Sequence, residues 1–361
     1  MSGTSLDGVD GVLANLDDGM HVLAHRHSPM PQALRAEMLA LNRPGDNELH
    51  RAALAGNALA ALYAANVSAL LQAAGLGADA VSAIGAHGQT VRHRPGAFDD
   101  TGYTLQLLNG ALLAELSGID VVCDLRSADV AAGGQGAPLV PAFHARCFAR
   151  AGVDLAVLNL GGIANLSLLP AVGSACGFDC GPGNILLDLW CQRHRGHAFD
   201  DDGRWAASGA VNPALLQALR SDPYFALAPP KSTGRDLFDA PWMDGVLSRV
   251  VPVSAVDVQA TLAALTVVCV VDALRAHAPF TQELLVCGGG GHNGHLMHSL
   301  AMALPALSVH STRQAGVPPD QVEALAFAWL AAERVALRPG NLPAVTGARG
   351  QRILGALHAA R

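Results

Sequence analysis

Glycine-rich polar turns stand beside short apolar segments at three separate places in the chain. The first is MSGTSLDG at residues 1–8, before an expected strand over Val9–Leu16. The second is Gly161–Asn165 after the expected strand Leu155–Leu160, and the third is the run of glycines from Gly288 after Glu283–Cys287. Glycine lets the backbone come close to a ligand, and turns of this kind can point several N–H groups at a phosphate. One such turn is as well explained by a hairpin tip or a linker, but three of them predict two domains that close on a nucleotide.

The composition predicts an α/β chain with two domains. A length of 361 residues exceeds the usual size of one domain. Because 51% of the residues are hydrophobic but only 4% are aromatic, the core consists largely of Ala, Leu and Val, as in helices on a parallel sheet. The glycine cluster at 133–138 indicates a boundary between domains 1–135 and 136–347. A closing helix over 348–361 is expected to pack on the first domain.

Charge and hydropathy argue against nucleic-acid and membrane partners. The net charge is −7, and the longest apolar run, Leu262–Val271, is far shorter than the roughly 20 residues of a bilayer span. The amino end carries no signal-peptide pattern, and the seven cysteines are scattered. We therefore expect a cytoplasmic protein with a small-molecule substrate.

The stretch GFDCGPGN at 177–184 places one carboxylate, Asp179, between an apolar strand and a glycine turn. Asn184 could cap the following amphipathic run Ile185–Trp190. An Asp at such a junction could be presented to a phosphorylated substrate, although the stretch taken alone is better explained as a plain polar strand-to-helix turn. His87 follows another apolar strand, where open α/β sheets place their ligands, but it could also be a solvated loop residue.

Several motifs together resemble one family, the bacterial anhydro-N-acetylmuramic acid kinases of the sugar kinase/heat-shock ATPase/actin superfamily. The matching segments span nearly the whole chain: MSGTSLDGVD, GAHGQTVRH, DLRSADVAAGGQGAPLVP, LNLGGIANLS, FDCGPGN, PPKSTGRDLF, CGGGGHN and VEALAFAWLA. The resemblance implies a two-domain actin-like ATPase (ribonuclease H-like) fold with an interdomain cleft. It also implies ATP-dependent hydrolytic opening of the 1,6-anhydro ring of anhydro-N-acetylmuramic acid with phosphorylation at O6, in cell-wall recycling.

The resemblance also assigns site residues. The family's catalytic aspartate falls on Asp179, a general base for the attacking water. The residues implied in ATP binding are Gly3, Thr4, Ser5, Leu6, Asp7, Gly8, Val9, Asp10, Gly161, Gly162, Asn165, Gly288, Gly289, Gly290 and Gly291. Mg²⁺ is expected only as its ATP complex, with no metal site made by the protein. We also expect a homodimer.

Three side chains are candidates for binding the sugar. Arg126 could pair with the lactyl carboxylate, because a guanidinium binds carboxylates through two hydrogen bonds. His87 and Glu323 could bind hydroxyl groups or the acetamide. An ordinary structural hydrogen bond or ion pair explains each of the three equally well.

Two departures from the family pattern stand out. An apolar strand usually precedes the first glycine turn, whereas this sequence begins inside that motif, so the first strand is expected to be missing. Cys180 replaces the usual Thr after the catalytic Asp. Two other functions remain open from the residues: a conventional amino-sugar kinase acting on a free hydroxyl, and a non-catalytic sensor of sugar or nucleotide.

Overall fold

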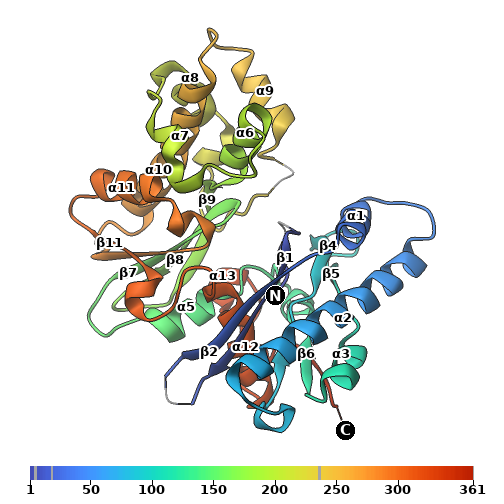
Figure 1. Ribbon diagram of the computed structural model, residues 1–361. Helices are drawn as coiled ribbons and strands as arrows, with labels where there is room; N and C mark the ends of the chain where they lie inside the picture. The colour runs from blue at the N-terminus through green and yellow to red at the C-terminus, as the bar shows by residue number, and fades with distance from the viewer. Residues whose placement is uncertain (4–5, 18, 235–236, 361) are drawn as a thin grey trace. The chain divides into compact units, whose positions relative to one another are not determined.

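The structure is a computed structural model that describes residues 1–3, 6–17, 19–234 and 237–360 (Figure 1). Thr4 and Ser5, two of the residues predicted to bind ATP, lie outside the described residues. The chain forms two compact units, one made of residues 1–147 and 321–361 and the other of residues 148–320.

This division differs from the predicted boundary at 135/136 and from the predicted second domain ending at 347. The glycine cluster that suggested a hinge is anchored inside the first unit by Asp129, whose carboxylate is fully buried. The Asp129 carboxylate accepts hydrogen bonds from Gly136 N at 2.8 Å and from Thr346 Oγ1 at 2.7 Å. Because a buried carboxylate needs such donors, residues on both sides of the cluster are held together.

The second unit is built on a sheet whose strand order is β11-β10-β7-β8-β9. Strands β7, β8 and β9 form an antiparallel meander, and β10 and β11 add parallel to β7. This order confirms the actin-like, ribonuclease H-like class for this unit. The strands are β7 (Leu155–Leu160), β8 (Ile163–Leu169), β9 (Cys176–Pro182), β10 (Glu283–Cys287) and β11 (Ser308–Ser311).

Helices α6 to α10 gather over one side of this sheet (Figure 1). The core helix α10 is buried along most of its length, and Ser254 caps its start by accepting a hydrogen bond from Asp257 N. Residues 208–212 separate the two short helices α7 and α8, and Asn212 caps the start of α8 by accepting a hydrogen bond from Leu215 N. The helices are α6 (Ile185–Arg195), α7 (Arg204–Ala207), α8 (Pro213–Arg220), α9 (Ala240–Leu247), α10 (Ala255–His277) and α11 (Gly294–Ala303), with short 3₁₀ turns η2 (Asp201–Gly203), η3 (Pro223–Ala226), η4 (Gly289–His292) and η5 (Thr312–Ala315).

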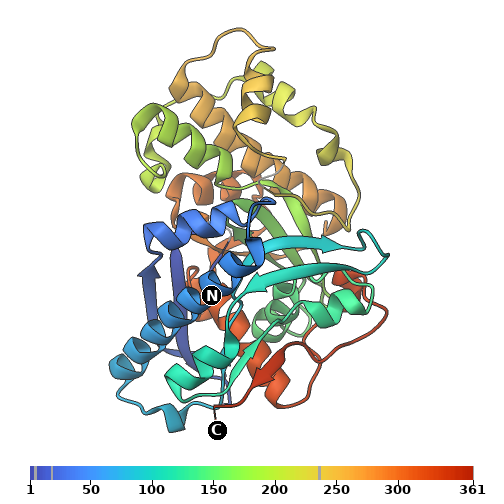
Figure 2. The same ribbon diagram turned by 90° about the vertical axis from the view of Figure 1, so that its right-hand side faces the viewer.

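The first unit combines two antiparallel hairpins, β1–β2 and β4–β5, with a small sheet of order β12-β6-β3. The long helix α2 contacts both hairpins, and its course can be followed in Figure 2. The elements are β1 (Gly8–Asn15), β2 (His21–Pro29), α1 (Gln32–Ala40), α2 (Glu48–Ala74), η1 (Ala78–Ala80), β3 (Ile84–Gly85), β4 (Gln89–Pro95), β5 (Gly102–Leu107), α3 (Gly110–Ser117), β6 (Val121–Cys123), α4 (Ser127–Ala131), α5 (Val140–Phe148), α12 (Val322–Val335), α13 (Pro343–Thr346) and β12 (Ala356–His358).

The predicted closing helix over 348–361 is wrong. Residues 356–358 form β12, which pairs antiparallel with β6 through Ala356 opposite Cys123 and His358 opposite Val121. The chain end does associate with the first unit, as expected, but through strand pairing. An Ala-rich segment can take this role because an exposed strand edge supplies the hydrogen-bond partners.

Two helices, α2 and α10, are long and apolar enough by length and composition to cross a membrane. The most apolar window of α10 is 67% buried inside the protein, and that of α2 is 39% buried. A core helix of a soluble protein meets the same criteria.

Candidate active site

Asp179 lies within β9 and not in the turn after it. It is paired across the sheet with Asn165 of β8, which in turn is paired with Asn159 of β7. Directly opposed residues of antiparallel strands stand on the same face of the sheet. Three polar side chains thus form a row across strands that are otherwise mostly buried and apolar.

Three polar groups of Asp179 are held by neighbouring residues of the second unit. Its backbone N–H donates to Lys231 O at 3.1 Å, and its Oδ2 accepts from Thr233 N at 2.9 Å. Its backbone carbonyl accepts from Tyr224 Oη at 2.8 Å. The other carboxylate oxygen, Oδ1, has no hydrogen bond to any residue that the structure describes.

Burial raises the pKa of Asp179 to about 6, and the Thr233 N–H and the Lys231 ammonium partly oppose that rise. A carboxylate with this pKa remains mostly ionised at pH 7. It also binds a proton more strongly than an ordinary aspartate, which suits a general base.

The turn between β7 and β8 is tied to the start of α6. Gly162 O accepts hydrogen bonds from Gly183 N and Ile185 N, and Gly161 O accepts one from Asn184 N. The predicted cap by Asn184 is wrong: its side chain makes no capping bond and donates to Leu160 O at 2.9 Å. The N–H groups of Gly183, Asn184 and Ile185 are therefore bonded within the protein and are not available to a ligand.

The glycine run after β10 lies against the end of β7. Gly288 has φ +78°, and a Cβ added there would stand 2.4 Å from Asn159 Oδ1. A Cβ added at Gly290 would stand 2.6 Å from the Leu160 Cβ, whereas none would meet a neighbour at Gly289. The lack of side chains at Gly288 and Gly290 is therefore what lets this turn approach the polar row.

The first glycine turn belongs to the first unit and is held by its neighbours. Gly3 O accepts from Leu6 N at 3.3 Å and from Gln89 Nε2 at 3.2 Å. Leu6 and Val9 are both 2% exposed and belong to the core of the first unit, so their side chains do not contact a ligand. At the other end of the turn, His27 Nδ1 lies 2.9 Å from Asp10 Oδ1.

His87, Arg126 and Glu323 come together in the first unit. Arg126 donates to His87 Nε2 through Nε at 3.1 Å and Nη2 at 2.9 Å, and to Gly136 O through Nη1 at 2.8 Å. The His87 ring lies 4.7 Å from the Phe327 ring, and Glu323 is one helical turn before Phe327 on α12. The structure thus brings the three predicted sugar-binding residues close together.

Burial and neighbouring charges shift the pKa values of His87, Arg126 and Glu323. Burial, and then Arg126, lower the pKa of His87 well below its usual value. The imidazole is therefore neutral, with Nδ1 donating to Gly88 O at 2.7 Å and Nε2 accepting. Desolvation lowers the pKa of Arg126 to about 10 and raises that of Glu323, while each partly offsets the shift of the other.

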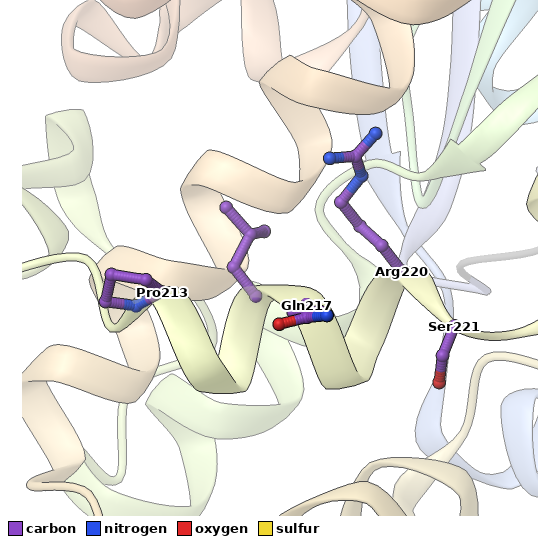
Figure 3. A pocket seen from close by; sticks show the side chains of 5 residues that line it. Pro213, Gln217, Arg220 and Ser221 are labelled. Atoms are coloured by element: carbon purple, nitrogen blue, oxygen red, sulfur yellow. The ribbon is translucent and has the colours of Figure 1, made fainter.

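Sequence reasoning missed Asn159, Tyr224, Lys231 and Thr233. Asn159 lies in the motif LNLGGIANLS, and Lys231 and Thr233 lie in PPKSTGRDLF, but no property of either segment indicated that these residues lie beside Asp179. A hollow along α8, lined by Pro213, Leu216, Gln217, Arg220 and Ser221, contains none of the predicted site residues (Figure 3). Within the described parts of the chain, no three His, Cys, Asp or Glu residues come together to hold a metal ion.

Comparisons with known proteins agree with the family resemblance of the sequence motifs. Residues 1–360 match the family model described as anhydro-N-acetylmuramic acid kinase. The chain is 59% identical to the anhydro-N-acetylmuramic acid kinase of Variovorax paradoxus (strain S110), covering 100% of this chain and 98% of the relative. It is 61% identical to the protein of the same name from Bordetella petrii, covering 100% of this chain and 95% of the relative.

Similarity to solved structures is weaker. The component A of (R)-2-hydroxyglutaryl-CoA dehydratase from Acidaminococcus fermentans has a TM-score of 0.46 at 13% identity, covering 88% of this chain and 93% of that one. Similarity at that level carries no argument about function. The family is shown instead by the match over residues 1–360 and by the identities near 60%. The chain belongs to the anhydro-N-acetylmuramic acid kinase family.

Proposed function

We propose that this protein uses ATP and water to convert anhydro-N-acetylmuramic acid to N-acetylmuramic acid 6-phosphate and ADP, in cell-wall recycling. Membership of the family supports the reaction. The observation that carries the mechanism is the setting of Asp179, whose Oδ2 is held by Thr233 N while Oδ1 is not bonded within the described residues. A base with one oxygen fixed and one available can take a proton in a defined direction.

In the proposed step, Asp179 Oδ1 takes a proton from a water molecule that attacks the anomeric carbon. The bond between that carbon and O6 breaks, and O6 takes the γ-phosphoryl group of ATP, releasing ADP. The water thus supplies the new anomeric hydroxyl group, and Asp179 later returns its proton to solvent. Positioned base catalysis contributes about 10²–10⁴-fold to the rate of such a step.

The glycine turns are proposed to hold ATP. In the second unit, the carbonyl oxygens of Gly161 and Gly162 accept hydrogen bonds from the start of α6. We propose that this turn binds phosphate through its backbone N–H groups. The run Gly288–Gly291 allows close approach of the nucleotide, because Gly288 and Gly290 lie against Asn159 and Leu160. In the first unit, Gly3–Asp10 is proposed to contribute backbone N–H groups, while the buried side chains of Leu6 and Val9 belong to the core.

Arg126, His87 and Glu323 are proposed to bind the sugar. Arg126 is fixed by its bonds to His87 and Gly136, and it retains further N–H donors for the lactyl carboxylate. Glu323 can accept hydrogen bonds from hydroxyl or amide groups.

Mg²⁺ is proposed to enter with ATP. In ATP complexes this ion is held mainly by phosphates and water, with one or two carboxylates as further partners. When bound, the ion would neutralise charge on the phosphates. Asp7 and Asp10 of the first turn could hold it through water.

The test is mass spectrometry of the products after incubation with the anhydro sugar, ATP and Mg²⁺. Ring opening predicts a product heavier by one phosphoryl group and one water. A conventional kinase would leave the ring closed and add the phosphoryl group only, and a sensor would give no product. Either result would overturn the proposal, and Asp179→Asn serves as the inactive control.

We also propose that the protein is cytoplasmic and forms a homodimer. The seven cysteines are free, as expected for a protein of the reducing cytoplasm. A homodimer is predicted from the resemblance, and analytical ultracentrifugation at assay concentrations would test it.

A further inference from the structure

The sequence contains a single lysine, Lys231, among 23 Lys and Arg residues. It lies in the second unit, in the segment Pro229–Gly234, which runs along β9 at the edge of the five-stranded sheet. The N–H of Asp179 donates to Lys231 O, so this segment satisfies a group that an edge strand would otherwise leave to solvent.

The side chain of Lys231 contacts Tyr224, a residue that is itself hydrogen-bonded to Asp179. Its ammonium nitrogen lies 4.9 Å from the centre of the Tyr224 ring, a cation–π contact. Tyr224 is only 6% exposed and packs edge-on against Phe238, with ring centres 5.6 Å apart. Its hydroxyl donates to Asp179 O, so Asp179, Tyr224 and Lys231 form a closed set of contacts.

Thr233, two residues after Lys231, completes the arrangement through its N–H on Asp179 Oδ2. If the segment moved away from β9, this hydrogen bond and the one to Lys231 O would both be lost. The orientation of the carboxylate therefore depends on what keeps the segment in place.

We propose that Lys231 is a positioning residue for Asp179: stacked on Tyr224, its ammonium group keeps Pro229–Gly234 on the edge of β9 and faces the Asp179 carboxylate. Thr233 then holds Oδ2, and Oδ1 is directed to the attacking water. This inference rests on the proposed function, because it assigns Lys231 a role through the base. A guanidinium would serve less well, since the compact ammonium acts as a point charge.

The charges around Asp179 agree with this role. Lys231, Tyr224 of η3 and the adjacent Cys180 of β9 interact electrostatically with Asp179, and Cys269 of α10 interacts with Tyr224 and Cys180. Burial raises the pKa values of the tyrosine and both thiols, so these groups are neutral near pH 7 and Lys231 carries the charge. Removing that charge should raise the proton affinity of Asp179.

The first experiment compares Lys231→Gln and Lys231→Arg with the unchanged protein by their pH profiles of kcat/KM. Lys231→Gln should lower kcat about tenfold or more at pH 7 and move the acidic limb to higher pH, because Asp179 binds its proton more tightly. The KM for ATP should stay within about threefold, since the glycine turns are unchanged. Lys231→Arg should keep the position of the limb while recovering part of kcat. A limb that does not move in Lys231→Gln overturns the inference.

The second experiment does not depend on activity. Reductive methylation with ¹³C-formaldehyde labels one lysine and the terminal amine, and dimethylation retains the positive charge. The lysine signal should change its shift and titrate at lower pH in Asp179→Asn, where the facing carboxylate is gone. If no ring opening is found but the signal responds, the proposed function fails and the contact stands. If ring opening occurs but neither the signal nor the limb changes, the role of Lys231 is wrong.

Discussion

Asn165 of β8 and Asp179 of β9 oppose each other directly across two antiparallel strands. A register shift between Ala164 and Asn165 precedes the pair, and bulges of this kind often redirect side chains beside active sites. Asn165, at the end of the second glycine turn, and the proposed base Asp179 are therefore neighbours. A charge introduced at position 165 should change the pKa of Asp179.

Replacement Asn165→Asp should move the acidic limb of kcat/KM to higher pH. In the unchanged protein this limb should have its midpoint near the Asp179 pKa of about 6, with activity rising as the carboxylate ionises. A second carboxylate directly opposite favours the protonated form of Asp179. Asn165→Ala is the control, because it removes the amide without adding charge and should leave the midpoint in place.

Replacement Asp179→Asn should abolish turnover and leave ATP affinity close to normal. The amide keeps the shape and can still accept from Thr233 N, but it cannot take a proton from water. A coupled ADP assay and titration calorimetry would measure the two effects. Residual turnover above about 1%, which corresponds to the smallest loss usual for a general base, would remove Asp179 from that role.

The same replacement should stabilise the second unit in a pH-dependent way. The Asp179 pKa is about 6 when folded, against 3.8 for a free side chain, so each pH increment between these values favours the unfolded form. Above pH 6 the cost is constant, at most about 3 kcal/mol at roughly 1.4 kcal/mol per pKa unit. Urea unfolding of Asp179→Asn should therefore show a gain over the unchanged protein that is larger at pH 8 than at pH 4. An equal difference at both values would contradict the raised pKa.

Glycine should be required at position 288 and not at position 289. An alanine at 288 would bring Cβ to 2.4 Å from Asn159 Oδ1 at φ +78°, so thermal stability should fall by about 1–3 kcal/mol and ATP affinity should weaken. Gly289→Ala meets no neighbour and is the matched control. Thermal unfolding and nucleotide titration of both variants check this, and equal effects would show that the close approach at 288 is unimportant.

Replacement Arg126→Lys should raise the KM for the sugar at least about tenfold, the usual effect of losing a charged hydrogen bond. Lysine cannot donate to His87 and Gly136 at once and still face a carboxylate. Arg94→Lys, at an exposed position of β4 in the same unit, should leave the KM unchanged. Steady-state kinetics with varied sugar would measure this, and a change in the KM for ATP alone would contradict the assignment.

Much of the second unit could be predicted because its signals are local. The strands Leu155–Leu160 and Glu283–Cys287 appear with the predicted bounds, since continuous apolar runs between polar turns are typical of buried strands. Asp179 was recognised from its flanking glycines and from the family motif, and its place beside Asn165 follows from strand pairing that the sequence alone did not reveal.

What could not be predicted depends on contacts between distant residues. Asn184 was expected to cap α6, but the carbonyl of Leu160 competes for its side chain. The predicted helix at the chain end is replaced by a strand, because pairing with the edge of β6 decides its conformation. Lys231 reaches Asp179 only because its segment lies along β9, and no periodicity or spacing reports such a contact.

The carboxylate of Asp129 is buried among donors from Gly136, Asn341 and Thr346. On the ribosome, the last two emerge only after residues 148–320 have been synthesised, so until then Asp129 Oδ1 lacks the donors from Asn341 and Thr346 that it has in the folded protein. The middle of the polypeptide can mature first, and the beginning reaches its final form only when translation is nearly over.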